Sequence, residues 1–497
     1  MKIIKRKIFN IMGIALLLYI TLFFQYKLYN KYENNNLENE NMLLNYENYD
    51  EKELFNIIRR PLMSNEFIEL RKREELHTYL WNSIFRNVTL LNSKDEKKLV
   101  EYKKKLMSES LFLTDNNIDN LPLNKKVLST VHQSLYPWLY GNKFNTFSDI
   151  VKSMSGKGIV ICTGDKHFKL ARSSIDTLRN ILNCTLPIEV FYNGESDLSL
   201  ENINILKEYN DVYVSDFSTY FNNEIINVSG WAIKPFAILA SRFEEVILMD
   251  ADVLYLRNPA SLFENKHYQE KGTLFFQDRT LNPGLSLGSQ WVKEWMNNPL
   301  PETRASRFWK EKTSHEMESS TVVMHKTKTI LGLLNVCKFN EYRFRLDVVY
   351  KMVYGDKETF WMGFDMARQS YYMNSKPCVF IGELFPNVEK NENEMKFCGH
   401  IAHMLEDGKI LFWNGHLIRD KKNINSSKTK IMNFTAYVEG PQKNWTPGLT
   451  CLKFKKNEVR KKLKLFGEET QNIFNRIIER EKQKHFVLQK KKGYSIV

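Results

Sequence analysis

Two short segments with continuous apolar character flank a helical pattern in the middle of the chain. Residues 158–163 and residues 186–192 are almost entirely apolar, and each run ends at a glycine-containing turn. Between them, apolar residues recur at three- and four-residue spacing over residues 168–182. Uninterrupted apolar runs of this length are typical of strands buried on both faces, and the order strand, helix, strand is typical of a parallel sheet. The pattern therefore predicts an α/β fold with a mostly parallel central sheet.

The same pattern continues into an acidic turn. A helix is expected over residues 231–242 and a buried strand over residues 245–249, and this strand runs directly into Asp250-Ala251-Asp252. Ligands of open α/β sheets bind at the carboxyl ends of the strands. Two carboxylates one residue apart suit Mn²⁺ or Mg²⁺, whose remaining positions a diphosphate can occupy. We therefore expect Asp250 and Asp252 to bind a metal ion, although a solvated acidic turn remains the alternative for an isolated Asp-x-Asp pattern.

Three further residues are candidates for binding the same ligand. Thr163 and Gly164 end the first expected strand, and the missing side chain of Gly164 allows a ligand to approach the backbone. Lys234 lies on the helix that leads to the acidic turn, where an ammonium group suits a phosphate. The alternatives are a plain tight turn at Gly164 and a surface lysine at position 234.

The segment around the acidic turn resembles a known family. Residues 231–259 are similar to the core of the fungal Golgi α-1,3-mannosyltransferases, and the resemblance covers roughly residues 150–420. It implies a GT-A fold, GDP-mannose as donor, and transfer with retention of configuration to mannose-ending N- or O-linked glycans of glycoproteins. Ser319-Ser320 stands where the family commonly has Ser-Gly, so an α-1,3 or an α-1,2 linkage remains open.

The resemblance also implies roles for residues late in the expected domain. A histidine commonly completes the metal shell of GT-A enzymes, and residues 399–403 and 411–416 are the region in which to search for it. We expect His403 in this role, with His400 as the competing candidate. Retention requires a front-face route or a carboxylate nucleophile. Asp356 and Glu358 are therefore the expected catalytic residues, which would orient the acceptor hydroxyl or stabilise an oxocarbenium-like state.

The N-terminus predicts an uncleaved membrane anchor. Lys2, Lys5, Arg6 and Lys7 precede an uncharged, largely apolar run over residues 8–24, which ends in bulky rather than small residues. Small residues mark a signal-peptide cleavage site, and positive charge before the run keeps the N-terminus cytoplasmic. We expect a cytoplasmic tail and transmembrane signal-anchor over residues 1–26, and a single-pass type II protein of the Golgi membrane with a luminal catalytic domain.

Sequons and cysteines agree with a luminal body. All six cysteines follow the expected anchor, and an oxidising lumen permits up to three disulfides, whose connectivity the sequence leaves open. Asn-x-Ser/Thr sequons, the acceptors of N-glycosylation, also occur only after it, at Asn87, Asn183, Asn227, Asn425, Asn433 and Asn444.

The rest of the chain divides by composition. We expect a luminal stem and helical accessory region over residues 27–150, the GT-A domain over residues 151–420, and a C-terminal helical extension over residues 421–497. Apolar positions at helical spacing support the accessory region, at Phe67, Leu70, Leu76, Leu80 and Phe85. Similar spacing from Ile473 to Ile478 predicts an amphipathic helix that braces the catalytic domain or serves as a partner helix in a transferase complex.

Charge and motifs restrict the partners. The formal net charge is +14, but the basic residues are spread along the chain without a zinc-finger or RNA-binding signature, so no nucleic-acid partner is expected. The expected acceptors are mannan or O-mannosyl glycans on secreted glycoproteins. Two alternatives stay open: a UDP-sugar-dependent glycosyltransferase on the same fold, and a catalytically inactive Golgi scaffold subunit.

Overall fold

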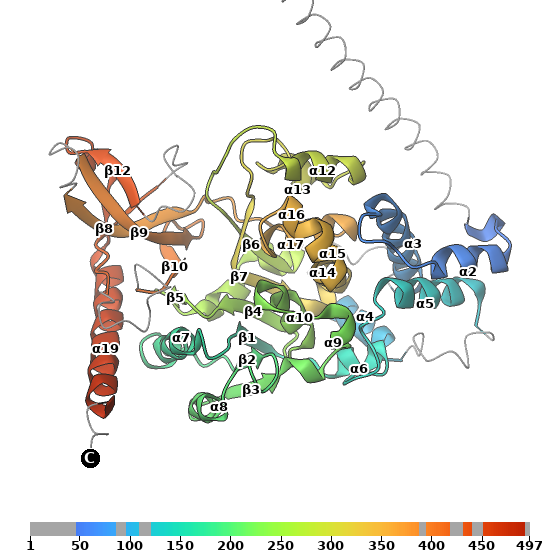
Figure 1. The fold of residues 1–497 in the computed structure, drawn as a ribbon, viewed down its shortest axis with the longest axis horizontal. Coiled ribbons are helices and arrows are strands. Elements are labelled where there is room, and N and C mark those ends of the chain that lie inside the picture. Colours follow the sequence, from blue (N-terminus) through green and yellow to red (C-terminus); the bar gives the residue numbers. More distant parts are fainter. Residues whose placement is uncertain are drawn as a thin grey trace, which may run out of the picture.

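The computed structural model describes residues 46–85, 96–108, 121–386, 394–417, 431–439 and 451–492. In these ranges a helical part, a six-stranded sheet and a seven-stranded sheet follow one another along the long axis of the molecule (Figure 1). None of the helices in these ranges is long and apolar enough to cross a membrane. The expected anchor, residues 1–26, lies outside the described residues and stays a prediction.

The helices before the first strand form one end of the molecule. They are α2 (Glu51–Arg59), α3 (Phe67–Phe85), α4 (Glu96–Ser108), α5 (Leu123–Leu135) and α6 (Phe147–Lys152). The five apolar positions expected to share one face of α3 are all buried. This helix packs on the α/β part, since Arg71 Nη1 donates a hydrogen bond of 2.9 Å to Asp365 O, and Asn335 Nδ2 donates one of 3.0 Å to Glu74 Oε2. The expected accessory region therefore shares its core with the α/β region.

The central sheet is mixed. Its strand order is β3 (Val212–Asp216), β2 (Ile188–Tyr192), β1 (Lys157–Cys162), β4 (Glu245–Asp250), β7 (Met317–His325) and β6 (Thr273–Gln277). The first four strands are parallel, and β7 runs antiparallel to both of its neighbours. The strands expected from the three apolar runs are β1, β2 and β4, which are three of the four parallel strands of the sheet.

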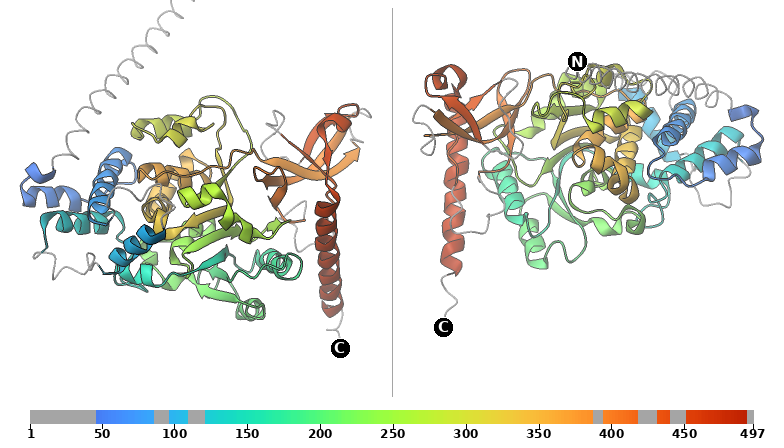
Figure 2. Two further views of the ribbon diagram at one scale, coloured as in Figure 1. Left: turned by 180° about the vertical axis from the view of Figure 1, so that it is seen from behind. Right: turned by 45° about the horizontal axis from the view of Figure 1, so that its top comes forward.

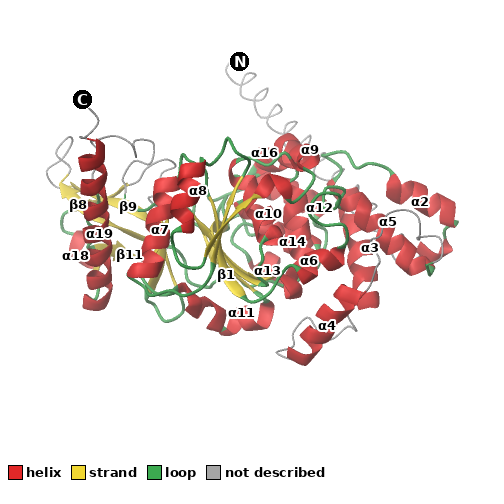
Figure 3. Cartoon of the chain, turned by 90° about the horizontal axis from the view of Figure 1, so that it is seen from below, coloured by secondary structure: helices red, strands yellow, loops and turns green. Residues whose placement is uncertain are grey.

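Both faces of this sheet are covered. Val246 and Leu248 of β4 face one core, and Ile247 and Met249 face the other, as the two-residue period of a strand requires. One face packs against α7 (Phe168–Asn180), α8 (Leu200–Lys207) and α11 (Lys266–Lys271), and the other against α10 (Ile233–Ala240), α14 (Lys326–Asn340) and α17 (Lys357–Met366). In Figure 3, α7 and α8 lie on one side of the strands and α10 and α14 on the other. Burial on both faces explains why these strands read as continuous apolar runs.

Shorter helices make the connections of this region and of the chain ends. They are η1 (Tyr46–Asn48), η4 (Phe217–Thr219), α9 (Asn223–Ile226), η5 (Gly230–Ala232), η6 (Pro259–Glu264), α12 (Leu287–Trp295), α13 (Pro301–Ala305), α15 (Tyr342–Phe344), η7 (Arg345–Val349), α16 (Tyr350–Met352) and α18 (Val459–Lys462).

A second, antiparallel sheet begins directly after the acidic turn. Its order is β13 (Lys464–Leu465), β11 (Ala436–Val438), β8 (Val379–Pro386), β9 (Glu394–Met404), β10 (Ile410–Asn414) and β5 (Val253–Tyr255), with β12 (Cys451–Lys455) paired to β9. Strand β5 follows β4 after Ala251 and Asp252 only. The Asp-Ala-Asp turn therefore lies where the chain passes from one sheet to the other.

The C-terminal region differs from the helical extension expected over residues 421–497. It contributes β11, β12 and β13 to the second sheet before the helix α19 (Glu468–Lys492), so a boundary at residue 420 would cut through this sheet. The hydrophobic pattern of the sequence did not predict these strands, because they are short and lie among polar residues. Helix α19 stands at the opposite end of the molecule from α2 and α3 (Figure 2). It packs through Phe474, Ile477 and Ile478, and Arg480 Nη2 donates a hydrogen bond of 2.9 Å to Asp176 Oδ1 of α7.

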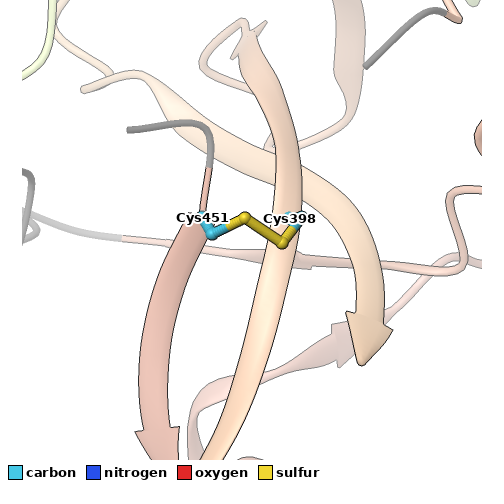
Figure 4. The surroundings of a disulfide bond; sticks show 2 residues. All are labelled: Cys398 and Cys451. Atoms are coloured by element: carbon cyan, nitrogen blue, oxygen red, sulfur yellow. A yellow bond between two sulfur atoms is a disulfide. The ribbon is translucent and has the colours of Figure 1, made fainter. Parts of the chain in front are cut away.

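One disulfide joins two strands of the second sheet. Cys398 of β9 and Cys451 of β12 are directly opposed and bonded (Figure 4). The other four cysteines are free thiols, of which three are buried. The upper limit of three disulfides is therefore not reached.

Candidate functional site

A cavity of about 650 Å³ opens at the carboxyl ends of β1, β2 and β4. The five residues that the sequence assigned to ligand binding all line it, namely Thr163, Gly164, Lys234, Asp250 and Asp252. They meet because parallel neighbours place their carboxyl ends at one edge, where Cys162 is paired with Asp250. The structure thus brings together residues that are up to 89 positions apart in the chain.

Lys234 connects two carboxylates at the base of this cavity. Its Nζ lies 3.0 Å from Asp250 Oδ1 and 3.3 Å from Asp356 Oδ2, and it donates a further hydrogen bond of 3.2 Å to Ser319 O. Lys234 is 5% exposed, so this side chain is no surface lysine. Burial opposes its charge, but Asp250 and Asp356 raise the pKa of Lys234 above its usual value, so the ammonium group is charged.

Negative charge exceeds positive charge around the cavity. Burial raises the pKa of Asp250 to about 7, Lys234 opposes this shift, and Asp252, Asp356 and Glu318 add to it by repulsion. Four carboxylates thus face one ammonium group. The side chain of Asp250 remains 24% exposed towards the cavity, so a ligand can reach it.

The second sheet holds the acidic turn from the other side. Asp252 O accepts hydrogen bonds from Gly415 N at 3.1 Å and His416 N at 2.8 Å. The ring of His416 is fixed in turn, because its Nε2 lies 2.9 Å from Ser173 Oγ of α7. Contacts from the segment after β10 therefore help to set the direction of the turn. The sequence analysis pointed to residues 411–416 only as a place to search for a metal-binding histidine, not for these backbone contacts.

The two expected histidine ligands lie behind the cavity wall rather than among its lining residues. His403 Nε2 is 3.3 Å from Glu318 Oε2, and the His403 ring stacks on Phe412 at 4.8 Å. His400 packs beside Gly415, where an added Cβ would lie 2.4 Å from His400 Nδ1. Glu318 itself reaches the cavity wall, because its Oε1 accepts a hydrogen bond of 3.0 Å from Asn414 Nδ2, and Asn414 lines the cavity.

The donor set fits a hard divalent cation that is shared with a ligand. Within the described ranges, no cluster of three or more His, Cys, Asp or Glu side chains is arranged to hold a metal ion by itself. Asp250 and Asp252 offer two carboxylates beside the cavity, and the excess of negative charge favours a cation there. Ligand oxygens, such as those of a diphosphate, would have to supply the remaining positions.

The structure separates the two expected catalytic carboxylates. Asp356 touches Lys234 and accepts a hydrogen bond of 3.0 Å from Ser319 Oγ, so it supports the cavity base from behind. Glu358 accepts hydrogen bonds from Glu316 N at 3.0 Å and Trp361 Nε1 at 2.6 Å. Neither side chain is among those that line the cavity. Glu358 thus ties the start of α17 to the chain before β7.

The far side of the cavity contains polar residues that the sequence analysis missed. Asp197 Oδ2 accepts a hydrogen bond of 2.9 Å from Asn193 N, and Asp197 O accepts one of 2.7 Å from Asp165 N. A Cβ on Gly164 would lie 2.1 Å from Asp197 Oδ1, so glycine is required there by this loop. The Asn193-Gly194 turn could have indicated this loop as part of the site. It follows the second apolar run, and that strand ends at the same edge of the sheet as β1 and β4.

Three sequons fall within the described residues. Asn183, Asn227 and Asn433 are exposed. Asn87, Asn425 and Asn444 lie outside the described residues.

Comparison with known proteins gives one family match. Residues 156–405 match the model of the family Mannosyl_trans3, described as "Mannosyltransferase putative". The chain is 29% identical over 340 residues to a Candida albicans protein named "Putative alpha-1,3-mannosyltransferase MNN14", covering 56% of this chain and 48% of that protein. It is 26% identical over 375 residues to "Alpha-1,3-mannosyltransferase MNT3" of Saccharomyces cerevisiae, covering 67% and 58%. The chain spans about half the length of the curated relatives it matches.

Solved structures show only a distant likeness. The mannosyltransferase Ktr4p of Saccharomyces cerevisiae is 12% identical with a TM-score of 0.30, covering 60% of this chain and 83% of that one. Mouse xyloside xylosyltransferase 1 is 11% identical with a TM-score of 0.28, covering 44% and 85%.

Proposed function

The chain belongs to the Mannosyl_trans3 family of mannosyltransferases, and from that premise we propose that it transfers mannose from GDP-mannose to mannose-ending glycans of glycoproteins, forming an α-1,3 linkage. The observation that carries the proposal is the cavity that combines Asp250 and Asp252 with Lys234 at the carboxyl ends of the parallel strands. Relatives named α-1,3-mannosyltransferases support the sugar and the linkage.

The proposed reaction exchanges one bond at the anomeric carbon for another. The bond between that carbon and the diphosphate oxygen breaks, and the electron pair leaves with the diphosphate. A bond forms between the same carbon and an acceptor hydroxyl oxygen, whose proton passes to the departing diphosphate. Because donor and product are both α-linked, configuration is retained. The carboxylates that line the described cavity are Asp250 and Asp252, which we assign to the metal ion, and Asp197, which accepts a hydrogen bond from Asn193 N. None of the three is therefore assigned as a nucleophile. This favours the front-face route.

Charge on the departing diphosphate is the main electrostatic demand of this reaction. We assign Asp250 and Asp252 to Mn²⁺ or Mg²⁺, which when bound neutralises that charge. Lys234 adds a fixed positive charge beside the same group, and Asp356 acts as a positioning residue that holds the ammonium group through its contact at 3.3 Å. Thr163 and Gly164, at the end of β1, would lie against the nucleoside part.

A location in the Golgi membrane, as a single-pass type II protein with a luminal catalytic region, is part of the same proposal. The basic and apolar N-terminal residues support it, as do the exposed sequons at Asn183, Asn227 and Asn433. The proposed acceptors are mannan or O-mannosyl glycans.

Donor discrimination tests the proposal against its closest alternative. The purified full-length chain in detergent should bind GDP in the presence of Mn²⁺ and transfer mannose from GDP-mannose to α-mannobiose, and methylation analysis should find a 3-substituted mannose. Transfer from a UDP-sugar but not from GDP-mannose would assign the chain to the UDP-sugar alternative, and a 2-substituted product would correct the linkage.

A further inference from the structure

Two large aromatic side chains are exposed at the rim of the cavity. Trp231 of η5 is 51% exposed and Tyr354 is 61% exposed, although Lys234 and Asp356, which follow them within three residues, form a buried ion pair. Their ring centroids are 5.5 Å apart with an interplanar angle of 43°. Exposed aromatic surface of this size next to a cavity is typical of a binding site.

The local backbone holds this pair in place. Gly355 follows Tyr354 with a φ of +65°, and a Cβ at this glycine would lie only 2.9 Å from Trp231 Cε3. A side chain at position 355 would therefore be strained and would push against the indole ring. His315 meets the Tyr354 ring edge-on at 5.8 Å, and Lys357 Nζ lies 5.2 Å from its centroid. The two rings thus form a supported surface rather than two independent side chains.

This surface is directly connected to the candidate reaction centre. Trp231 lines the cavity together with Lys234, whereas Tyr354 extends beyond the lining. Gly355 is followed by Asp356, whose carboxylate contacts Lys234, and Lys234 contacts Asp250. The aromatic pair is therefore joined through Gly355 and Asp356 to the Lys234 and Asp250 contacts at the base of the cavity.

We propose that Trp231 and Tyr354 form the acceptor subsite, on which the apolar face of the terminal hexopyranose of an acceptor glycan rests. This inference depends on the proposed function. A pyranose ring presents C–H groups on its face and hydroxyl groups at its edge, so it can cover an aromatic surface and keep its hydroxyl groups hydrated. An acceptor glycan continues out of the enzyme, so its site has to open to solvent, as this pair does. The guanine ring of a donor is the competing occupant.

Separate kinetics for donor and acceptor test this assignment. For the full-length chain, Trp231→Ala and Tyr354→Ala should each raise KM for α-mannobiose by about tenfold, with a smaller effect on KM for GDP-mannose. Tyr354→Phe should restore most of the acceptor affinity, because it keeps the ring. Tyr79→Ala is the matched control, since Tyr79 is 57% exposed on α3, and it should leave both values unchanged.

Direct binding separates failure of the inference from failure of the proposed function. Calorimetric titration of α-mannobiose into the GDP-loaded chain should show binding that Trp231→Ala weakens about tenfold, whether or not transfer is detected. An unchanged acceptor affinity in both alanine variants, or no binding by the unmodified chain, would overturn the inference. Loss of GDP affinity with normal acceptor affinity would instead assign the aromatic pair to the base. Acceptor binding without any GDP-mannose turnover would count against the proposed function alone.

Discussion

Lys234 Nζ lies 3.0 Å from Asp250 Oδ1, and this contact places a buried cation directly behind the acidic turn. The same ammonium group contacts Asp356, so one lysine neutralises two carboxylates that are far apart in the sequence. Removing the ammonium group would leave both carboxylates without a counter-charge, which costs more than the ion pair itself contributes.

Replacing Lys234 should therefore destabilise the protein as well as abolish donor binding. We expect Lys234→Met to lower the free energy of unfolding by about 3 kcal/mol, because Asp250 and Asp356 lose their counter-charge. Urea unfolding followed by circular dichroism measures the change, and Lys207→Met, at an exposed lysine of α8, is the control. A loss below about 1 kcal/mol, the level of a surface ion pair, would contradict this account.

Replacing Gly164 tests the role of the loop that contains Asp197. In Gly164→Ala the new Cβ would collide with Asp197 Oδ1 and with Asp197 O, at 2.1 Å and 2.7 Å. We expect a loss of about 1 to 3 kcal/mol in unfolding free energy and at least tenfold weaker GDP binding, because the Asp165 and Asn193 contacts move with this loop. Gly467→Ala should change neither value, since no atom lies within 4 Å of its added Cβ. Normal GDP binding by Gly164→Ala would separate this loop from the nucleotide.

Glu74 should make stability depend on pH. Burial raises the pKa of Glu74 from 4.5 to about 7, despite hydrogen bonds from Tyr136 and Asn335. A raised folded-state pKa stabilises the protein fully below the unfolded pKa, and this contribution is lost as pH rises towards 7. As pH rises from 4.5 towards 7, the unfolding free energy of the unmodified chain should fall by up to ~3 kcal/mol relative to that of Glu74→Gln, whose side chain cannot titrate.

The pH dependence of the unfolding free energy must be compared between the unmodified chain and Glu74→Gln. Buried histidines are present in both proteins and change stability with pH in the opposite direction. Burial lowers the pKa of His77 to about 3, so this residue destabilises the fold as pH falls. Urea unfolding of both proteins at pH 5 and pH 7.5 gives the difference. A difference that does not change with pH would show that Glu74 is ionised throughout.

The disulfide should stabilise the second sheet. Cys398 and Cys451 are 53 residues apart, and closing a loop of this size is expected to contribute about 4 kcal/mol. Cys451→Ser or a reductant should therefore lower the Tm of the unmodified chain, and the reductant should have no further effect on the variant. Cys378→Ala, at a free thiol, should keep the response to reductant. The same Tm with and without reductant would contradict the bond.

The sequence pattern was informative where burial is continuous. Strands β1, β2 and β4 are covered on both faces, so their apolar runs and the turns after them could be located, and with them the cavity edge. The pattern did not reveal β11 and β12, because these strands have only three and five residues and lie among polar residues. It also could not show that Asp-Ala-Asp leads into that second sheet.

The roles of single side chains were harder to predict than the location of the site. Asp356 and Glu358 are two positions apart in sequence, but the turn into α17 directs Asp356 to Lys234 and Glu358 to Glu316 N. Contacts between residues far apart in the chain decide such directions, so spacing alone gave both residues the same role. Glu318 and Asn414 were missed for the same reason, since they meet only when β7 and β10 are brought together.

The central claim rests on Asp250 and Asp252, and metal-dependent sugar transfer tests it most directly. The full-length chain in detergent, supplied with GDP-mannose, α-mannobiose and Mn²⁺, should form mannotriose, and EDTA should stop the reaction. Asp250→Ala/Asp252→Ala should lower kcat/KM by at least ~10³-fold, because the diphosphate loses its charge stabilisation. Full activity in EDTA, or in a correctly folded double variant, would contradict the account.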